Sequence, residues 1–264
     1  MDSDGCVLDT MDVKHMRCLG PCLVHVWNLE EYRDEIIRLW RKVNLFSPAR
    51  GLNRFRGLAK VLAEIHENYV RVEGLSEYIY WVQTTREHSD ESLEEAFERT
   101  GSSCIRKAME WSNLVNQSMA MISDKKKQPF DGAREALESI RSYVDVVVVT
   151  AANGAEIRKE WEAQSLIQYT DLLVSQETGR KAECLKKLVQ KGYEPGHVLM
   201  IGDSPADLKA AKEAGALFYP VLVYQERESW EAFPEILKQF LKGTYSSEEE
   251  ARQIQEFQKN LGVQ

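Results

Sequence analysis

Two pairs of carboxylates in this chain have the spacing of a cation site. Asp2 and Asp4 stand in the opening segment DSDGCVLDT, and Asp203 and Asp207 stand in the segment GDSPAD. Carboxylate oxygens are ligands that Mg²⁺ prefers, and a carboxylate can also act as a nucleophile or carry a proton. If the fold brings these acids together, they indicate cation-assisted chemistry on a small substrate.

A hydroxyl and an ammonium group accompany the carboxylates. Thr150 follows the apolar run VDVVVV at 144–149, Asp203 follows the run VLMI at 198–201, and Lys181 begins an amphipathic segment. Short apolar runs that alternate with helical patterns predict a parallel α/β sheet. In such sheets ligands bind beyond the carboxyl ends of the strands, so we expect these groups to meet at one edge.

The pattern of apolar residues divides the chain into a helical first half and an alternating second half. We expect strands at 144–149, 171–175, 198–201 and 216–219. In the second half we expect helices at 131–142, 155–164, 180–191, 206–214, 229–241 and 248–261. In the first half we expect helices at 29–43, 58–69, 89–99 and 102–121.

The order of these segments resembles the haloacid dehalogenase superfamily, whose members are mostly magnesium-dependent phosphatases. DSDGCVLDT is similar to the first motif, VVVVTAAN to the second, and LMIGDSPADLKAAKEAGA to the fourth. Lys181 stands where the lysine of the third motif is expected, with Arg180 as the alternative. The resemblance covers residues 1–10 and 131–220, and it implies a Rossmann-like parallel-sheet core with three αβα layers.

By this resemblance, Asp2 would attack phosphorus and form an aspartyl-phosphate. Asp4 would protonate the leaving oxygen and then activate water. Thr150, Ala151 and Lys181 would bind the phosphoryl oxygens, where charge develops during the reaction.

The resemblance also implies a Mg²⁺ site. Asp2, Asp4 and Asp203 would hold the ion, with Asp4 contributing its backbone carbonyl, and Asp207 would orient Lys181 or a water on the metal. A phosphate monoester carries two negative charges, so a carboxylate nucleophile needs such a cation before it can approach.

The resemblance also implies that a lid is inserted either after the first motif or between the second and third motifs. The chain between the first and second motifs is far longer than the chain between the second and third, which leaves no room for a lid in the later gap. We therefore expect residues 1–11 and 126–264 to form the core domain and residues 12–125 to form a helical cap. Such a cap would close over the site and exclude water.

Two groups of residues in the expected cap allow more than one interpretation. Arg50, Arg54 and Arg56 could bind a second anionic group of the substrate, although a solvated loop is the simpler interpretation. Lys14 and His15 could line the pocket.

The spacing H-x2-C-x3-C-x2-H is formed by His15, Cys18, Cys22 and His25. Zinc takes such ligands, but its usual sites draw them from two separated pairs. Four ligands along one helix can hardly enclose an ion, so we expect these residues to pack the helix.

The composition excludes several classes of partner. The chain has 264 residues with 34 Lys and Arg against 42 Asp and Glu, a formal net charge of −8. This charge gives no general attraction to nucleic acid or to an anionic membrane, and no run approaches the roughly 20 apolar residues of a membrane span. The start of the chain lacks the basic residues of a signal peptide, and five cysteines do not suit a disulfide scaffold. We expect a cytoplasmic protein that binds a small phosphorylated metabolite, and its oligomeric state stays open.

Only Met1 precedes Asp2, although the resemblance places the nucleophile at the end of a central strand. That strand would lie between those ending at Val149 and Ile201. Without it, these two strands would lie about 9.6 Å apart, too far to hydrogen-bond. We therefore expect the first core strand to be missing, and we hypothesise that the natural protein has residues upstream of Met1.

The first hypothesis for function is a Mg²⁺-dependent phosphatase that acts on a small phosphomonoester. A phosphomutase that transfers a phosphoryl group on a sugar phosphate would use the same nucleophile and is the near alternative. A non-catalytic binding protein with the same fold is the second hypothesis, because a chain without its first strand would hold Asp2 poorly.

Overall fold

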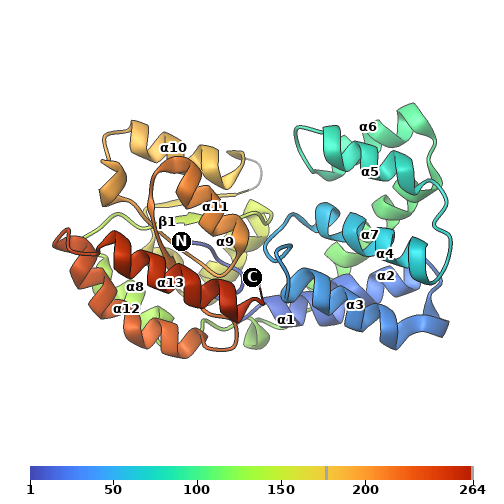
Figure 1. Ribbon diagram of the computed structural model, residues 1–264. Coiled ribbons are helices and arrows are strands. Elements are labelled where there is room, and N and C mark those ends of the chain that lie inside the picture. Colours follow the sequence, from blue (N-terminus) through green and yellow to red (C-terminus); the bar gives the residue numbers. More distant parts are fainter. Residues whose placement is uncertain (176–177, 263–264) are drawn as a thin grey trace. The chain divides into compact units, whose positions relative to one another are not determined.

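A computed structural model describes residues 1–175 and 178–262 of the chain. The chain divides into two compact units (Figure 1). Met1–Met11 and Ser123–Gln264 form an α/β unit, and Asp12–Ile122 form an all-helical unit. The predicted fold class, a parallel α/β core with an inserted helical part, is confirmed.

The strands of the α/β unit form two parallel pairs. β1 (Val147–Val149) pairs with β2 (Leu172–Val174), and β3 (Leu199–Gly202) pairs with β4 (Leu217–Pro220). All four strands lie within or next to the ranges expected from their apolar runs.

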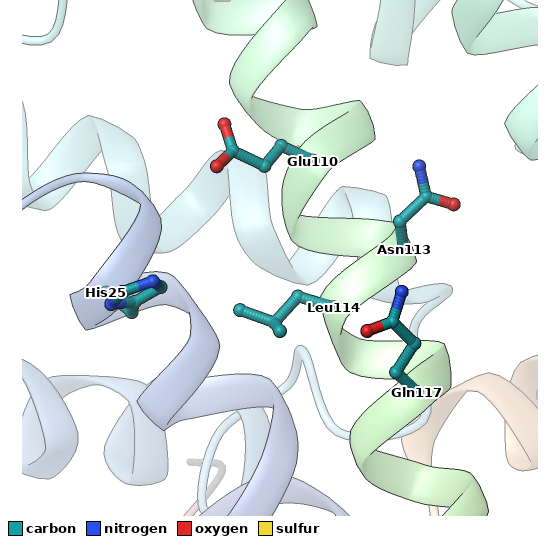
Figure 2. Close-up of a pocket in the computed structure, with 5 residues that line it drawn as sticks. All are labelled: His25, Glu110, Asn113, Leu114 and Gln117. Atoms are coloured by element: carbon teal, nitrogen blue, oxygen red, sulfur yellow. The ribbon is translucent and has the colours of Figure 1, made fainter.

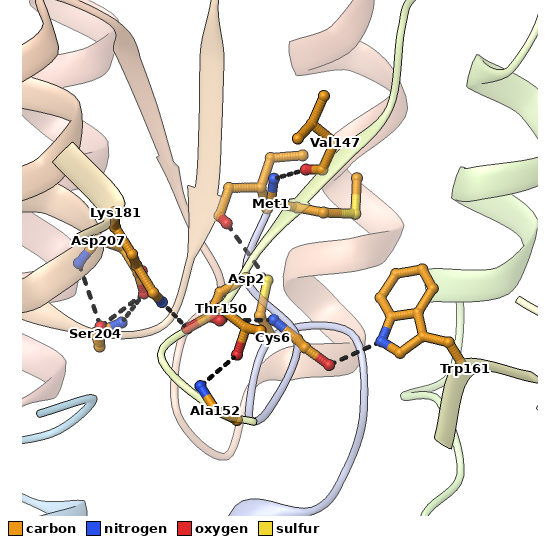
Figure 3. A network of polar contacts seen from close by, with 12 residues as sticks. Met1, Asp2, Cys6, Val147, Thr150, Ala152, Trp161, Lys181, Ser204 and Asp207 are labelled. Carbon is orange, nitrogen blue, oxygen red and sulfur yellow. Dashed lines mark hydrogen bonds and ion pairs between the residues drawn. The ribbon is translucent and has the colours of Figure 1, made fainter. Parts of the chain in front are cut away.

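Met1 and Asp2 lie between the two strand pairs (Figure 3). The Met1 ammonium donates to the carbonyl of Val147 (2.8 Å), and the Val149 amide donates to the Met1 carbonyl (2.8 Å). On the other side, the Asp2 amide donates to the carbonyl of Ile201 (2.9 Å). Asp2 therefore takes the central position that the resemblance implies, between β1 and β3.

In the part of the α/β unit that the structure describes, six helices surround the strands. They are α8 (Ala133–Ile140), α9 (Gly154–Ala163), α10 (Lys181–Gln190), α11 (Pro205–Ala214), α12 (Glu226–Leu241) and α13 (Ser247–Asn260). Short 3₁₀ turns occur at Asp124–Lys126, Ile167–Tyr169 and Pro195–His197. Side-chain caps explain several starts, because Asn153, Ser204 and Ser246 each accept backbone N–H groups at the first turn of the helix they precede.

The helices cover both faces of the strands. Apolar residues of α8, α9 and α12 share one core with β1 and β3, which includes the buried Trp161 and Trp230. On the other side α10 packs against α11, and α11 contacts β3 and β4. Parallel strands buried on both faces account for the nearly continuous apolar runs in the sequence.

The segment that returns from the helical unit is held at two places in the α/β unit. It pairs with the outgoing segment, since the Asp9 amide donates to the Gln128 carbonyl (2.8 Å) and the Phe130 amide to the Val7 carbonyl (2.9 Å). Its Lys127 ammonium also lies 3.0 Å from Oε1 of Glu160 on α9, and both side chains are buried.

The helical unit has its own aromatic core, which includes Trp40 and Trp111. Its helices are α1 (Met11–Lys14), α2 (Gly20–Val26), α3 (Arg33–Leu45), α4 (Arg54–Asn68), α5 (Leu75–Thr84), α6 (Asp90–Thr100) and α7 (Ser103–Ala120). A π-helical turn (His15–Leu19) joins α1 to α2, and a 3₁₀ turn (Glu30–Tyr32) precedes α3. The sequence patterns did not predict α1 or α5, whereas α2 overlaps the helix expected to carry His15, Cys18, Cys22 and His25. Within the described residues, no helix combines the length and apolar character needed to cross a lipid bilayer.

The buried Lys127–Glu160 pair predicts a large and specific loss of stability. Replacing Lys127 with Met removes the ammonium from a buried carboxylate, so we expect the free energy of unfolding to fall by about 3 kcal/mol. Lys125→Met changes an exposed lysine of the same segment and is expected to have an effect within about 0.5 kcal/mol. Urea unfolding followed by circular dichroism measures both, and equal effects would contradict the assignment.

Candidate active site

The carboxylate of Asp2 is held on both of its oxygens. Its Oδ1 accepts a hydrogen bond from the Ser3 amide (2.7 Å), and its Oδ2 lies 2.5 Å from Nζ of Lys181. The side chain is buried, with 5% of the residue exposed. Asp2 therefore has one fixed orientation at the centre of the strands.

Lys181 joins two carboxylates. It is the first residue of α10, and its Nζ lies 2.6 Å from Oδ1 of Asp207 in addition to its contact with Asp2. Burial alone would lower the pKa of this ammonium, but the two carboxylates raise it above its ordinary value. Lys181 therefore stays charged, and its contact with Asp2 favours it for the third-motif position, which stays a prediction. Arg180, the alternative, is exposed to solvent and pairs with Glu183.

Asp207 is fixed by the start of α11. Its Oδ2 accepts hydrogen bonds from the amide (3.1 Å) and hydroxyl (2.6 Å) of Ser204, which in turn caps the helix. A Cβ added at Gly202 would lie 2.5 Å from the Asp207 side chain, so only glycine leaves room for it. Both carboxylate oxygens of Asp207 are thus committed to contacts within the protein.

Asp2, Asp203 and Asp207 form an acidic cluster. One carboxylate oxygen from each lies within 4.8 Å of the others, and all three residues are buried. Burial, followed by the negative charge of Asp207, raises the pKa of Asp2 to about 8, despite the opposing effect of Lys181. Three acids with one ammonium leave excess negative charge, and their hard oxygen donors fit a divalent cation such as Mg²⁺.

Asp4 lies outside this cluster in the described structure. Its carboxylate accepts a hydrogen bond from the Thr10 hydroxyl, and the residue is partly exposed. The turn after Asp4 requires a glycine, because Gly5 has a φ of +80°. Asp4 lies on the same loop as Asp2, and several backbone hydrogen bonds hold this loop.

Thr150 directly follows β1 and lies next to Asp2. The Val149 amide donates a hydrogen bond to the Met1 carbonyl. The residues that follow, Thr150 and Asp2, therefore lie at the same edge of the strands. The Thr150 hydroxyl accepts a hydrogen bond from the Ala152 amide (3.2 Å), which closes the loop that contains Ala151 (Figure 3).

Two contacts of the first-motif loop were not predicted from the sequence. Trp161 on α9 donates to the Ser3 hydroxyl (2.8 Å), and Trp230 on α12 donates to the Cys6 carbonyl (2.9 Å), so indoles hold the first-motif loop. Ser204 could have been found, because S-x-x-D before a helix is a capping pattern. The tryptophan contacts join residues far apart in the sequence and leave no local signal.

Two of the arginines of the helical unit are engaged within it. Arg50 is buried and donates to the Leu45 carbonyl (3.3 Å), so a solvated loop is the wrong interpretation for this residue. Arg54 bonds to Asp90 (3.2 Å) and Asn116 (2.6 Å), whereas Arg56 is exposed.

The His and Cys residues of the possible zinc motif do not converge. His15 accepts a hydrogen bond from Trp40 (3.1 Å), Cys18 and Cys22 are buried, and His25 is exposed. Throughout residues 1–175 and 178–262, the acidic cluster is the one group of three or more potential ligands that meet. Lys14, the other residue expected near the pocket, is buried in the helical unit.

A separate groove of about 390 Å³ lies on the helical unit between α2 and α7 (Figure 2). None of the residues predicted to bind substrate or metal lines it. Its lining residues are His25, Glu110, Asn113, Leu114 and Gln117.

Comparison with known proteins gives a family match. The sequence model described as haloacid dehalogenase-like hydrolase matches residues 58–221, more than half of the chain. The matched range contains Thr150, Lys181, Asp203 and Asp207 and begins after the first motif. A search of curated proteins finds no match.

Solved structures with a similar fold come from several bacteria. A proposed beta-phosphoglucomutase from Thermotoga maritima is 17% identical, with coverage of 89% of this chain and 97% of that chain and a TM-score of 0.47. A subfamily IA hydrolase from Geobacter sulfurreducens is 18% identical, with 83% of each chain covered and a TM-score of 0.41. L-2-haloacid dehalogenase from Xanthobacter autotrophicus is 14% identical, with 84% and 75% covered and a TM-score of 0.43. Likeness at this level says nothing about the activity of this chain.

The acidic cluster predicts stabilisation by a divalent cation. A ligand at a hundred times its dissociation constant stabilises a fold by about 2.7 kcal/mol, so saturating Mg²⁺ should raise the unfolding temperature by about 5–10 °C. Asp203→Asn should abolish this Mg²⁺-dependent shift, whatever it does to the metal-free protein.

Asp131→Asn is the control, because it removes an exposed carboxylate of the same unit. Differential scanning calorimetry with and without Mg²⁺ measures the shift. The same shift in Asp203→Asn and in the unaltered protein would argue against this cation site.

Proposed function

The chain belongs to the haloacid dehalogenase-like hydrolase family, and from this premise we propose that it is a Mg²⁺-dependent phosphatase of a small phosphomonoester. One observation carries the proposal. The Asp2 carboxylate is buried at the centre of the strands with Lys181 and two further carboxylates around it. A nucleophile, a phosphate-binding cation and a metal-binding set would thus share one position.

Asp2 is the proposed nucleophile. Its Oδ1 is held by the Ser3 amide, which leaves Oδ2, on the Lys181 side, to attack phosphorus and form an aspartyl-phosphate. The ammonium that now contacts Oδ2 would move to the incoming phosphoryl oxygens, and Asp207 would keep it nearby. The Thr150 hydroxyl and the Ala151 amide would bind the remaining phosphoryl oxygens.

Asp4 is the proposed proton carrier. It would protonate the leaving oxygen and then take a proton from the water that hydrolyses the intermediate. Its partial exposure suits proton exchange, and the Thr10 hydroxyl holds its carboxylate in the described structure. This hydrogen bond must break or turn when Asp4 meets a leaving group.

Asp2 and Asp203, with the backbone carbonyl of Asp4, would hold the metal ion, and Asp207 would act through Lys181. When bound, Mg²⁺ would neutralise the excess negative charge and polarise the phosphoryl group. Burial and the charge of Asp207 raise the pKa of Asp2, so a cation beside the carboxylate would favour the ionised form that a nucleophile needs.

We assign the helical unit, Asp12–Ile122, the role of a cap that contributes contacts to the substrate. We also place the protein in the cytoplasm, since all five cysteines are buried thiols, as expected in a reducing compartment. We propose a small phosphorylated metabolite as the partner, because the acidic net charge disfavours a polyanion such as nucleic acid.

The nucleophile gives the decisive test. Asp2→Asn should lower kcat for Mg²⁺-dependent hydrolysis of a chromogenic phosphate ester by at least about 1,000-fold, because the amide cannot form the acyl-phosphate. Asp12→Asn changes an exposed acid nearby in the sequence and should stay within about twofold.

Four results would contradict the phosphatase. Equal activity of Asp2→Asn and the unaltered protein would remove Asp2 from catalysis. Halide release from a 2-haloacid without ester hydrolysis would indicate a dehalogenase, and conversion of one sugar phosphate into its isomer would indicate a mutase. A folded, full-length protein with none of these activities would favour a binding protein.

A further inference from the structure

We propose that Trp161 is a positioning residue for Asp2 and Asp4, and that it acts by holding the side chain of Ser3 between them. The proposal rests on the proposed function, because it assigns a supporting role in the same site. Trp161 would touch neither substrate nor metal.

The contact is a single buried hydrogen bond between distant parts of the chain. Nε1 of Trp161, which is labelled in Figure 3, lies 2.8 Å from Oγ of Ser3. Both residues are fully buried at 0% exposure. If this hydrogen bond breaks, a buried donor and a buried acceptor are left without a partner, which costs free energy because neither can bond to water. This bond therefore holds Ser3 in one rotamer.

Ser3 is the central residue of the loop. Its amide donates to Oδ1 of Asp2, so the orientation of the nucleophile depends on the Ser3 peptide. Its carbonyl closes the turn by accepting three backbone amides, from Cys6, Val7 and Leu8. A shift of Ser3 would turn the Asp2 carboxylate and move the loop on which Asp4 lies.

The helix that carries Trp161 is itself anchored, so it can act as a support. The neighbouring Glu160 forms the buried ion pair with Lys127. One turn on, the Gln164 side chain donates to the Asp124 carbonyl (3.0 Å). With α9 tied to residues 123–130, the indole can position the loop instead of moving with it.

A double-mutant cycle tests the role. Ser3→Ala and Trp161→Phe should each lower kcat by about 10- to 100-fold, the range for lost orienting contacts, with KM changed by less than about twofold. The double variant should be no slower than the slower single variant, because both changes remove the same bond.

Trp111→Phe is the matched control. Trp111 is equally buried, and its indole donates to the Leu19 carbonyl (3.0 Å) in the helical unit. Trp111→Phe should lower the free energy of unfolding as Trp161→Phe does, but its kcat should stay within about twofold of that of the unaltered protein. Far-UV circular dichroism confirms that each variant is folded at the assay temperature.

A second measurement needs no activity. The Cys6 thiol is fully buried with its Sγ 3.6 Å from the Ile201 carbonyl, so it reacts with a thiol reagent only when the loop opens. Labelling of Cys6, followed by mass spectrometry of its peptide, should be about tenfold faster in Ser3→Ala and Trp161→Phe and unchanged in Trp111→Phe.

The two measurements separate the two proposals. If the unaltered protein shows no Asp2-dependent hydrolysis, the proposed function fails, and Cys6 labelling alone decides whether Trp161 positions the loop. If hydrolysis depends on Asp2, the kcat values decide. A kcat for Ser3→Ala and Trp161→Phe within twofold of the control overturns the positioning role. The role is also overturned if the loss of kcat in the double variant equals the product of the two single losses.

Discussion

The Lys181 ammonium lies between two buried carboxylates, and the arrangement of the site depends on this contact. Charges taken out of water persist only where opposite charges and hydrogen bonds replace hydration. Lys181 begins α10 and Asp207 lies in the first turn of α11, so the contact also ties two helix starts to the centre of the strands. One ammonium among three acids leaves a net negative charge, which is the physical reason that a divalent cation would fit there.

The second constraint is the backbone position of Asp2. Three hydrogen bonds through Met1 and Asp2 join β1 and β3. The loop directly after Asp2 holds the carboxylate from its other side, because the Ser3 amide donates to Oδ1 of Asp2. The tight turn with Gly5 at positive φ and the indoles of Trp161 and Trp230 supply that support from the loop and from two helices.

The elements that position the site could be predicted because their signals are local. The run at 144–149 predicts a buried strand, and the cap residues Asn153 and Ser204 mark the helices that come after two of the strands. The buried pair Lys127–Glu160 could not be predicted. Lys127 lies in a polar segment that contains Pro and Gly, and nothing in this segment indicates that its side chain contacts α9. The catalytic and metal-binding roles of Asp2, Asp4 and their neighbours stay predictions, because geometry shows proximity and not reaction.

Glu160 and Trp161, two adjacent residues of α9, connect the returning segment to the loop of Asp2. Consecutive helical residues point about 100° apart, so adjacent side chains face different neighbours. Glu160 faces the returning segment through Lys127, while Trp161 faces the loop of Asp2 through Ser3. A displacement of residues 123–130, which are covalently continuous with the helical unit, would therefore act on α9 and through α9 on the nucleophile. Because both contacts are buried, such a displacement would cost more free energy than the bending of an exposed linker, and α9 is the element that would resist it.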